Sequence, residues 1–233
     1  MSHPPLVHRG TFAVLGPAGD VTGARGASPD GLFLRDARHL SRWQLTLDGA
    51  PPAVLVPMTT TGPAAPATAV LTPPVGRDEP PPYTVVREQA VAAGALVERL
   101  RIIGNRAEPC TVRLALTVDA DFADQFELRS DRRTYDKGDG RRTCALRTDG
   151  AEFDYRRGAW HSRTTVTARP APDAVAAAEP VSATGSAAQR LSWELELPPH
   201  GRAELTLRVV AQPHGTAPPR SVPDDPSAVT AER

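Results

Sequence analysis

The sequence predicts an all-β fold, a large antiparallel β-sandwich with long Pro-rich loops and at most one or two short helices. Several segments alternate apolar and polar residues with the period of two that is typical of a strand with one buried face. The 25 Pro and 18 Gly residues cluster mainly between those segments, where they indicate turns and loops. A chain of 233 residues is long enough to form one large sandwich.

The predicted strands follow one another along most of the chain. A strand ending at the Asp48-Gly49 turn comes first, and a break around Gly94 makes the next two a hairpin. The Asp149-Gly150 pair is the strongest short hairpin signal in the chain. The predicted strands cover residues 43–47, 84–91, 95–103, 112–118, 143–148, 151–156, 191–197 and 203–209.

The remaining segments predict loops and little helix. Prolines punctuate residues 50–82, so that region is expected to hold short edge strands and long connections. Residues 170–188 are rich in Ala, Pro and Ser and predict an exposed insertion. Residues 119–129 are the best internal helix candidate. A second helix is expected to start at Asp225, a capping residue followed by Pro226.

These signals divide the chain into three parts. Residues 1–10 are expected to be a flexible N-terminus, residues 11–211 the sandwich domain, and residues 212–233 a linker and the start of a truncated helix. Because a helix of so few residues is marginal alone, we interpret the chain end as a fragment boundary.

The amino-acid composition limits the classes of binding partner that the sequence suggests. Lys+Arg and Asp+Glu are equal at 27 each, so the net charge gives no reason to expect a nucleic acid or an anionic membrane. No secretory leader and no membrane-spanning apolar run is recognisable in the sequence. Cys110 and Cys144 are too few for a disulfide framework, and we expect reduced thiols in a cytoplasmic protein.

One charged cluster lies beside a strand start. Asp36 and Arg38, two residues apart, would share one face of an extended segment. They could bind a polar partner, but a structural ion pair that holds a loop is the favoured alternative. His39 could act as a general base, yet no nucleophile or orienting carboxylate is assigned to it. A surface or packing histidine is therefore the preferred interpretation.

A second cluster is acidic. If residues 119–129 are helical, Asp121, Asp124 and Glu127 lie three apart along one face and could bind a hard cation or supply an acid and a base. The Gly and the spacing of an EF-hand loop are missing. The alternative is an exposed or capping cluster paired with Arg129 and its basic neighbours. Since nucleotide, zinc and serine-hydrolase motifs are also missing, the sequence predicts no catalytic residues, no metal and no cofactor.

The chain resembles the N-terminal domain of bacterial glycogen-debranching-type proteins, which are amylo-α-1,6-glucosidase-like. The resemblance lies in residues 11–15 with Gly19-Asp20, the stretch GLFLRDARHLSRWQLTL at 31–47, residues 97–101 with Asn105, and residues 120–129. It covers most of residues 10–210. It implies a supersandwich-like β domain that precedes an (α/α)₆ barrel, with the catalytic acid and base in that barrel.

Three functional hypotheses follow from the resemblance and the residues. The preferred one is a non-catalytic domain that supports an absent C-terminal helical catalytic domain, with an α-glucan oligosaccharide as a candidate second partner. Asp36, Arg38, Asp121, Asp124, Glu127 and Arg129 would then anchor loops or form interdomain contacts. The alternative is a stand-alone carbohydrate-binding module using Trp160 and Tyr83 as sugar platforms. The third is an active enzyme using Asp121 and Glu127.

Overall fold

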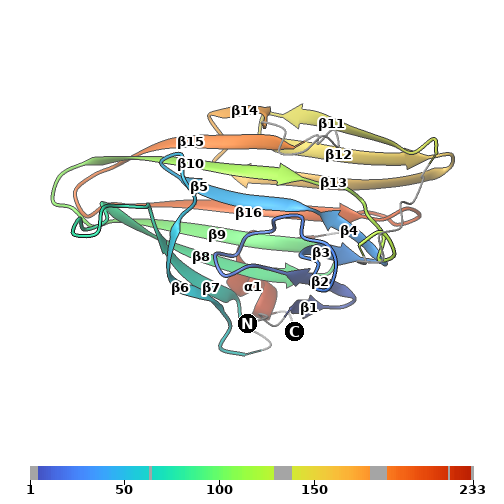
Figure 1. Ribbon diagram of the computed structural model, residues 1–233, viewed down its shortest axis with the longest axis horizontal. Coiled ribbons are helices and arrows are strands. Elements are labelled where there is room, and N and C mark those ends of the chain that lie inside the picture. The colour runs from blue at the N-terminus through green and yellow to red at the C-terminus, as the bar shows by residue number, and fades with distance from the viewer. Residues whose placement is uncertain (1–4, 63–64, 129–137, 179–187, 220, 232–233) are drawn as a thin grey trace.

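The computed structural model describes residues 5–62, 65–128, 138–178, 188–219 and 221–231, and it is an all-β sandwich, as predicted. The strands form three antiparallel sheets, which we call A, B and C. Sheet A has the order β1-β2-β3-β4, sheet B the order β14-β15-β10-β5, and sheet C the order β11-β12-β13-β16-β9-β8-β7-β6. The long strands of sheets B and C run along the longest axis of the molecule (Figure 1).

The strand bounds match most of the predicted segments. Sheet A contains β1 (Leu6–His8), β2 (Thr11–Val14), β3 (Gly31–Leu34) and β4 (Ala37–Leu40). Sheet B contains β5 (Arg42–Leu47), β10 (Cys110–Asp119), β14 (Ala174–Ala177) and β15 (Gln189–Leu197). Sheet C contains β6 (Ala53–Thr59), β7 (Ala67–Thr72), β8 (Tyr83–Ala92), β9 (Ala95–Gly104), β11 (Arg141–Arg147), β12 (Gly150–Arg157), β13 (Trp160–Arg169) and β16 (Arg202–Gln212).

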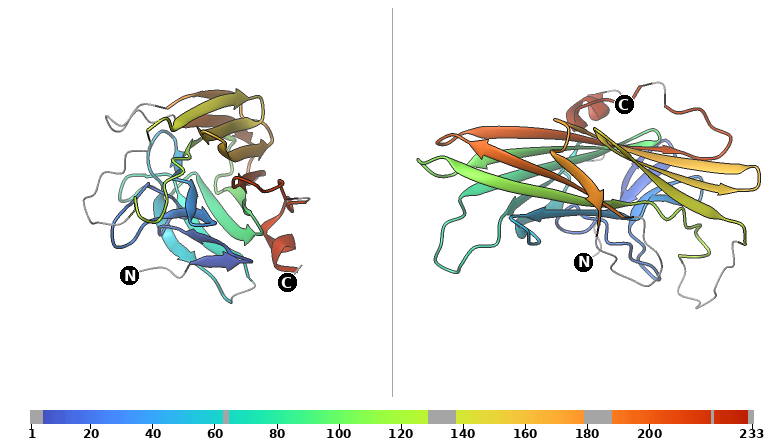
Figure 2. Two further views of the ribbon diagram at one scale, coloured as in Figure 1. Left: turned by 90° about the vertical axis from the view of Figure 1, so that its right-hand side faces the viewer. Right: turned by 90° about the horizontal axis from the view of Figure 1, so that it is seen from above.

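Sheets B and C enclose one hydrophobic core. Alternate residues of β10 and β15, such as Leu114 and Leu191, face the interior and join the same buried cluster as Leu100 of β9 and Leu207 of β16. This arrangement follows from the period of two, because every second side chain of each strand can reach the facing sheet. The view from above in Figure 2 shows the strands of sheets B and C as two stacked layers.

The connection after β15 changes sheets. β15 pairs with β10 in sheet B, whereas β16 lies between β13 and β9 in sheet C. The short loop at Pro198 to Gly201 therefore joins the two layers. Both predicted hairpins are confirmed, because β8 pairs with β9 around Gly94 and β11 pairs with β12 around Gly150.

The predicted helix at 119–129 is wrong for the residues that the structure describes. β10 continues to Asp119, Phe122 has a positive φ of 52°, and Asp124 forms a β-bridge with Ala37. A bulky residue in the left-handed region cannot belong to a right-handed helix. The segment is an extended connection that ends in a turn.

The first and the last described elements both pack against neighbouring strands. β1 lies within the segment that we expected to be flexible, and it pairs with β2. The predicted C-terminal helix forms as α1 (Pro226–Ala231), and Val229 packs with Ala90 and Val97 on the outer face of sheet C. Among the described residues, no helix has the length and apolarity needed to cross a membrane.

The two Pro-rich regions also contain strands. β6 is the edge strand of sheet C, and β7 lies beside it, as expected for residues 50–82. The predicted insertion at 170–188 contributes β14, which pairs with β15 at the edge of sheet B.

Candidate functional site

Arg38 is the centre of a polar cluster that joins two neighbouring segments to a third, which lies 83 positions away in the sequence. Its side chain is only 1% exposed. Nε and Nη2 donate to the two carboxylate oxygens of Asp121 at 3.1 and 2.5 Å, while Nη1 donates to the carbonyl oxygens of Ala24 at 2.8 Å and Asp30 at 3.1 Å. Such a bidentate pair fixes both partners in one geometry. β4 is thereby tied to the loop before β3 and to the segment after β10.

The loop of residues 22–30 is held from within by Asp30. Its carboxylate accepts hydrogen bonds from the backbone N–H groups of Thr22 at 2.6 Å, Gly23 at 3.0 Å and Ala24 at 2.7 Å. Arg25 then reaches across to Asp121 at 3.4 Å. Because the carboxylate satisfies three backbone donors, the loop is ordered without regular secondary structure.

Asp124 and Glu127 organise the turn after β10. Asp124 Oδ1 accepts from the backbone N–H groups of Phe126 at 2.9 Å and Glu127 at 3.0 Å. Glu127 Oε2 accepts in return from the backbone N–H of Asp124 at 2.8 Å. The acidic spacing that suggested a helix is thus the spacing of a self-capped turn.

Of the six residues proposed as anchors, the structure brings four together in one cluster. Arg38, Asp121, Asp124 and Glu127 form the polar cluster with Arg25 and Asp30. Asp36 is exposed in the β3–β4 turn, where its φ is +63° and its carbonyl oxygen accepts from Gln125 at 3.1 Å. Arg129 lies outside the described residues.

An apolar groove adjoins the polar cluster. It encloses about 360 Å³, and its floor includes Phe12 stacked on Phe33 with ring centroids 4.8 Å apart. Phe12 is 39% exposed, so a large part of its side chain remains accessible. Asp36 is the one charged residue in the groove's described lining, which comprises Pro5, Phe12, Val14, Gly26, Ala27, Ser28, Pro29, Phe33, Asp36, Gln125 and Leu128.

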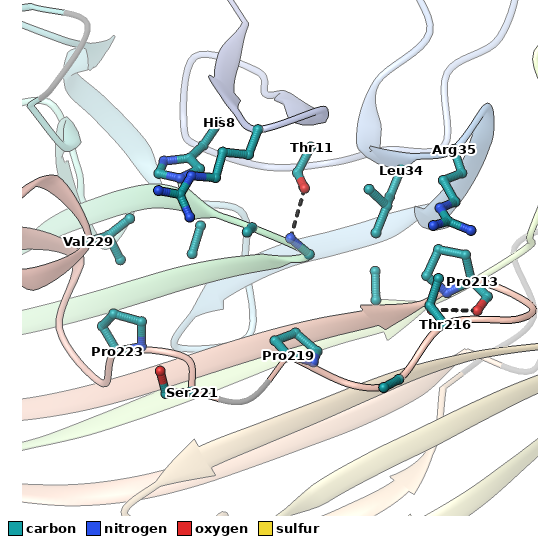
Figure 3. A pocket seen from close by; sticks show the side chains of 16 residues that line it. His8, Thr11, Leu34, Arg35, Pro213, Thr216, Pro219, Ser221, Pro223 and Val229 are labelled. Carbon is teal, nitrogen blue, oxygen red and sulfur yellow. Dashed lines mark hydrogen bonds between the residues drawn. The ribbon is translucent and has the colours of Figure 1, made fainter. Parts of the chain in front are cut away.

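A second cavity, the linker pocket, lies between the N-terminal hairpin and the C-terminal linker. It encloses about 500 Å³ (Figure 3). His8 and Arg35 lie toward opposite ends of the pocket in Figure 3, and Thr11 lies between them. Thr11 Oγ1 accepts from the backbone N–H of Gly94 at 2.8 Å, which ties the hairpin to the β8–β9 turn. The described lining contains Arg9 as well but no carboxylate side chain, so its polar character is basic.

A buried charged network in the sandwich interior was not predicted. Arg87 donates to Glu98 at 3.0 Å and also pairs with Asp20, and Glu98 accepts from Trp43 Nε1 at 2.6 Å. Burial opposes the charge of Arg87, but Glu98 and Asp20 outweigh it and raise the pKa of the guanidinium. Arg87 and Glu98 occupy inward positions in strands whose other inward residues are mainly apolar. These two charged residues at otherwise apolar inward positions were the signal in the sequence that could have indicated the network.

His39 is not placed as a general base. It is fully buried, Nδ1 lies 3.3 Å from Thr164 Oγ1, and its ring meets Phe122 edge to face. Burial lowers the pKa of His39 to about 4, although an interaction with the backbone of Arg163 favours the protonated ring and acts in the opposite direction. A neutral, enclosed imidazole has no access to a substrate.

The two proposed sugar platforms differ in accessibility. Tyr83 is fully buried, and its hydroxyl donates to Asp48 at 2.8 Å, so its ring offers no face to a sugar and we do not retain it as a platform. Trp160 is 52% exposed and stacks on His214 with centroids 4.6 Å apart. Its Nε1 donates to Ser162 at 3.2 Å, which fixes the indole orientation.

The geometry favours structural and binding roles. Within the described ranges, no group of three or more His, Cys, Asp and Glu side chains is arranged to hold a metal ion. The carboxylates of Asp121 and Glu127 accept hydrogen bonds from Arg38 and from the backbone. They therefore hold segments of this chain together.

Comparison with protein families gives a match over residues 6–208, from β1 to near the end of β16. The matching family is described as the N-terminal domain of some glycogen debranching enzymes. The chain belongs to this family. The resemblance seen in the sequence is thus confirmed, and the matched range of this debranching-type domain ends before the linker.

One larger protein of known structure shows the same fold, and in a second the chain covers a comparable share of the length. A putative kojibiose phosphorylase from the human microbiome has a TM-score of 0.55 and 5% identity, with 89% of this chain covering 29% of that chain. A bacterial glucoamylase complexed with acarbose has a TM-score of 0.49 and 7% identity, with 99% of this chain covering 35% of that one. The debranching-type domain thus spans about a third of the length of these proteins. No curated protein sequence matches it.

Proposed function

We propose that the chain is the non-catalytic N-terminal domain of a bacterial glycogen-debranching-type α-glucan hydrolase. It packs on and supports a helical (α/α)₆ catalytic barrel, which carries the acid and the base. Membership of the debranching-type family supports this function, since the family is defined as an N-terminal domain. The unpaired thiols of Cys110 and Cys144 agree with a reducing, cytoplasmic location for the enzyme.

The observation that carries the proposal is the attachment of the C-terminal segment to sheet C. Asp225 pairs with Arg99 at 2.5 Å, and Asp224 pairs with Arg208 at 2.8 Å. Arg208 also donates to the carbonyl oxygen of Val222 at 3.3 Å, and Val229 of α1 is buried. A domain joined to α1 would start from a fixed position on the sandwich, which suits a supporting role.

The test compares the isolated chain with the longer protein that the proposal implies. We expect the isolated chain to release no glucose from glycogen limit dextrin and the longer protein to release it. Asp121→Asn in the longer protein should lower the thermal midpoint without abolishing hydrolysis. Hydrolysis by the isolated chain that is lost in Asp121→Asn would instead establish the enzyme hypothesis and overturn a supporting role.

A stand-alone carbohydrate-binding module is the second candidate, and the exposed Trp160 favours it. His214 supports one face of the indole, so the side chain is held in place for a sugar ring to stack on it. Co-sedimentation of the chain with glycogen should then occur and should be lost in Trp160→Ala. Leu146→Ala is the matched control, because Leu146 is comparably exposed at 55% on the edge strand β11. Equal co-sedimentation of both variants would exclude a Trp160 platform.

A further inference from the structure

We propose that the apolar groove on sheet A is the docking site for the helical catalytic domain. It would receive an apolar side chain that is followed closely by an Arg or Lys. The inference rests on the proposed function and adds which surface makes the contact and what chemistry the partner presents there.

The groove has fixed walls. The backbone N–H of Gly26 donates to the carbonyl oxygen of Leu128 at 2.6 Å, and Arg38 N–H donates to Ala123 at 2.8 Å. The Arg38–Asp121 pair lies behind both segments and holds β4 against them. A groove whose walls are already ordered loses little conformational entropy when a partner binds, which favours docking.

Apolar side chains continue outside the groove. Val7 lies opposite Phe12 across β1 and β2, and Phe12 lies opposite Phe33 across β2 and β3, so the three form a row on one face of sheet A. Val7 is 54% exposed and Phe126, in the turn after β10, is 49% exposed. An exposed apolar row such as Val7, Phe12 and Phe33 marks a protein interface, and a partly exposed aromatic side chain is a typical anchor.

The polar groups of the lining select between a protein and a sugar as the occupant. A sugar ring can stack its apolar face on an aromatic side chain, but its hydroxyl groups need hydrogen-bond partners around the ring edge. The described lining offers the side chains of Ser28, Asp36 and Gln125 for this and is otherwise Phe, Val, Leu, Pro, Ala and Gly. Asp36 is the one charged residue of the described lining and is exposed, so it complements a cation on the partner. An apolar anchor beside an Arg or Lys fits both features.

The experiment uses the longer protein with a specific protease site inserted after Gly215. Gly215 is exposed and lies in the linker between β16 and α1, so a site inserted after it is accessible to the protease. After cleavage, the two halves should stay together, and their dissociation constant is measured by dilution. Phe12→Ala should weaken the association about tenfold or more, as expected for a central aromatic anchor. Leu146→Ala should leave it unchanged.

Asp36→Asn provides a second variant that does not depend on packing. It should weaken the association by roughly threefold at low salt and reduce its salt dependence, while the Asp225–Arg99 and Asp224–Arg208 pairs keep the remainder. Wild-type affinity in both Phe12→Ala and Asp36→Asn, with the halves still associated, would overturn the docking site but leave the supporting function intact. Immediate separation of the wild-type halves would overturn both. Maltoheptaose binding that is lost in Phe12→Ala, with association unchanged, would identify a sugar site instead.

Discussion

At the scale of single residues, His39 is the buried titratable group with the clearest consequence. Thr164 Oγ1 donates to the carbonyl oxygen of His39 at 2.8 Å, so it can accept from Nδ1–H of the same residue. Nε2 is buried and has no hydrogen-bond partner among the described residues. A proton on Nε2 would create an enclosed charge without a counterion, which explains the pKa of about 4.

This low pKa predicts a loss of stability in mild acid. The unfolded chain binds a proton on His39 near the ordinary value of 6.5, whereas the folded chain does so only near 4. The stabilisation is therefore complete above 6.5 and is lost as the pH falls toward 4. His39 should lower the free energy of unfolding by about 2 kcal/mol between pH 7.5 and pH 5. Urea unfolding at the two pH values measures this difference.

His39→Met should remove most of that difference, and the exposed His200 gives the control. His200 has a φ of +51°, so His200→Asn keeps a residue that tolerates this conformation. An acid response that is unchanged in His39→Met would show that other groups cause it.

Gly19 lies where both the backbone conformation and the surrounding space favour glycine. Its φ is +81°, and an added Cβ would lie 2.5 Å from Met58 Cε and 2.8 Å from Gln89 Oε1. Gly49 has a φ of +84° but no atom within 4 Å of its Cβ position. Gly49→Ala should therefore cost about 1 kcal/mol from backbone strain alone, and Gly19→Ala about 3 kcal/mol. Equal thermal midpoints for the two variants would show that the side chains near Gly19 rearrange without a loss of stability.

At the scale of elements, strands with one solvent-exposed face were predictable from the sequence. Turns that are held by side-chain hydrogen bonds were not. The alternation in β5, β10 and β16 gives their positions, because burial on one face is a local property of the sequence. The turn at Asp124 uses the same i, i+3 acidic spacing as a helix face. Only the left-handed Phe122 and the bridge to Ala37 distinguish the two, and neither has a sequence signature.

The candidate site was likewise predictable only in part. The crowding of charge around Asp36 and Arg38, and between Asp121 and Glu127, was visible in the sequence. Their contact was not, because the Arg38–Asp121 pair spans 83 positions and depends on how sheet A meets the end of β10. The groove was missed entirely, since its aromatic pair comes from β2 and β3 and its rim from two turns.

α1 is a short element that depends on its first residue. Asp225 Oδ1 accepts from the backbone N–H of Ser227 at 2.8 Å, and Oδ2 pairs with Arg99 at 2.5 Å. Asp225→Ala should weaken both contacts, and the last turn should exchange its amide hydrogens roughly tenfold faster, which corresponds to about 1.4 kcal/mol. Mass spectrometry of peptides that cover residues 222–231 measures this rate.

Asp225→Asn separates the two contacts, because asparagine caps a helix about as well as aspartate but carries no charge. We expect an exchange rate between those of the wild type and Asp225→Ala. Exchange in Asp225→Ala at the wild-type rate would mean that packing of Val229 alone holds the helix.

At the scale of the whole molecule, the sandwich class was predictable and the partition of strands between sheets was not. β15 and β16 have the same alternation and a short connection, yet they belong to different layers. The network of Arg87, Gln89 and Glu98 contradicts the expectation that polar residues face solvent, since all three are fully buried between the sheets.

Glu98 connects the two sheets, and the free energy of unfolding should be sensitive to the loss of its charge. Glu98→Gln keeps the shape but leaves Arg87 with Asp20 as its remaining carboxylate partner among the described residues, so we expect a loss of about 3 kcal/mol in the free energy of unfolding. Glu88→Gln is the matched control on the outer face, where Glu88 pairs with Arg99 and Arg101, and it should cost under about 1 kcal/mol. Denaturant unfolding measures both, and an equal loss would contradict a special role for the interior pair.

The central place of β16 has a consequence for how the protein is made. Leu205 of β16 pairs with Leu100 of β9, and on its other side β16 pairs with β13. On the ribosome, β9 and β13 therefore emerge long before the strand that fills the space between them. Until residues 202–212 leave the exit tunnel, the nascent chain carries two open strand edges, which are the features that invite pairing with other chains. Closure of the large sheet is thus a late event in the synthesis of this domain, and the nascent domain is most open to wrong pairing just before it.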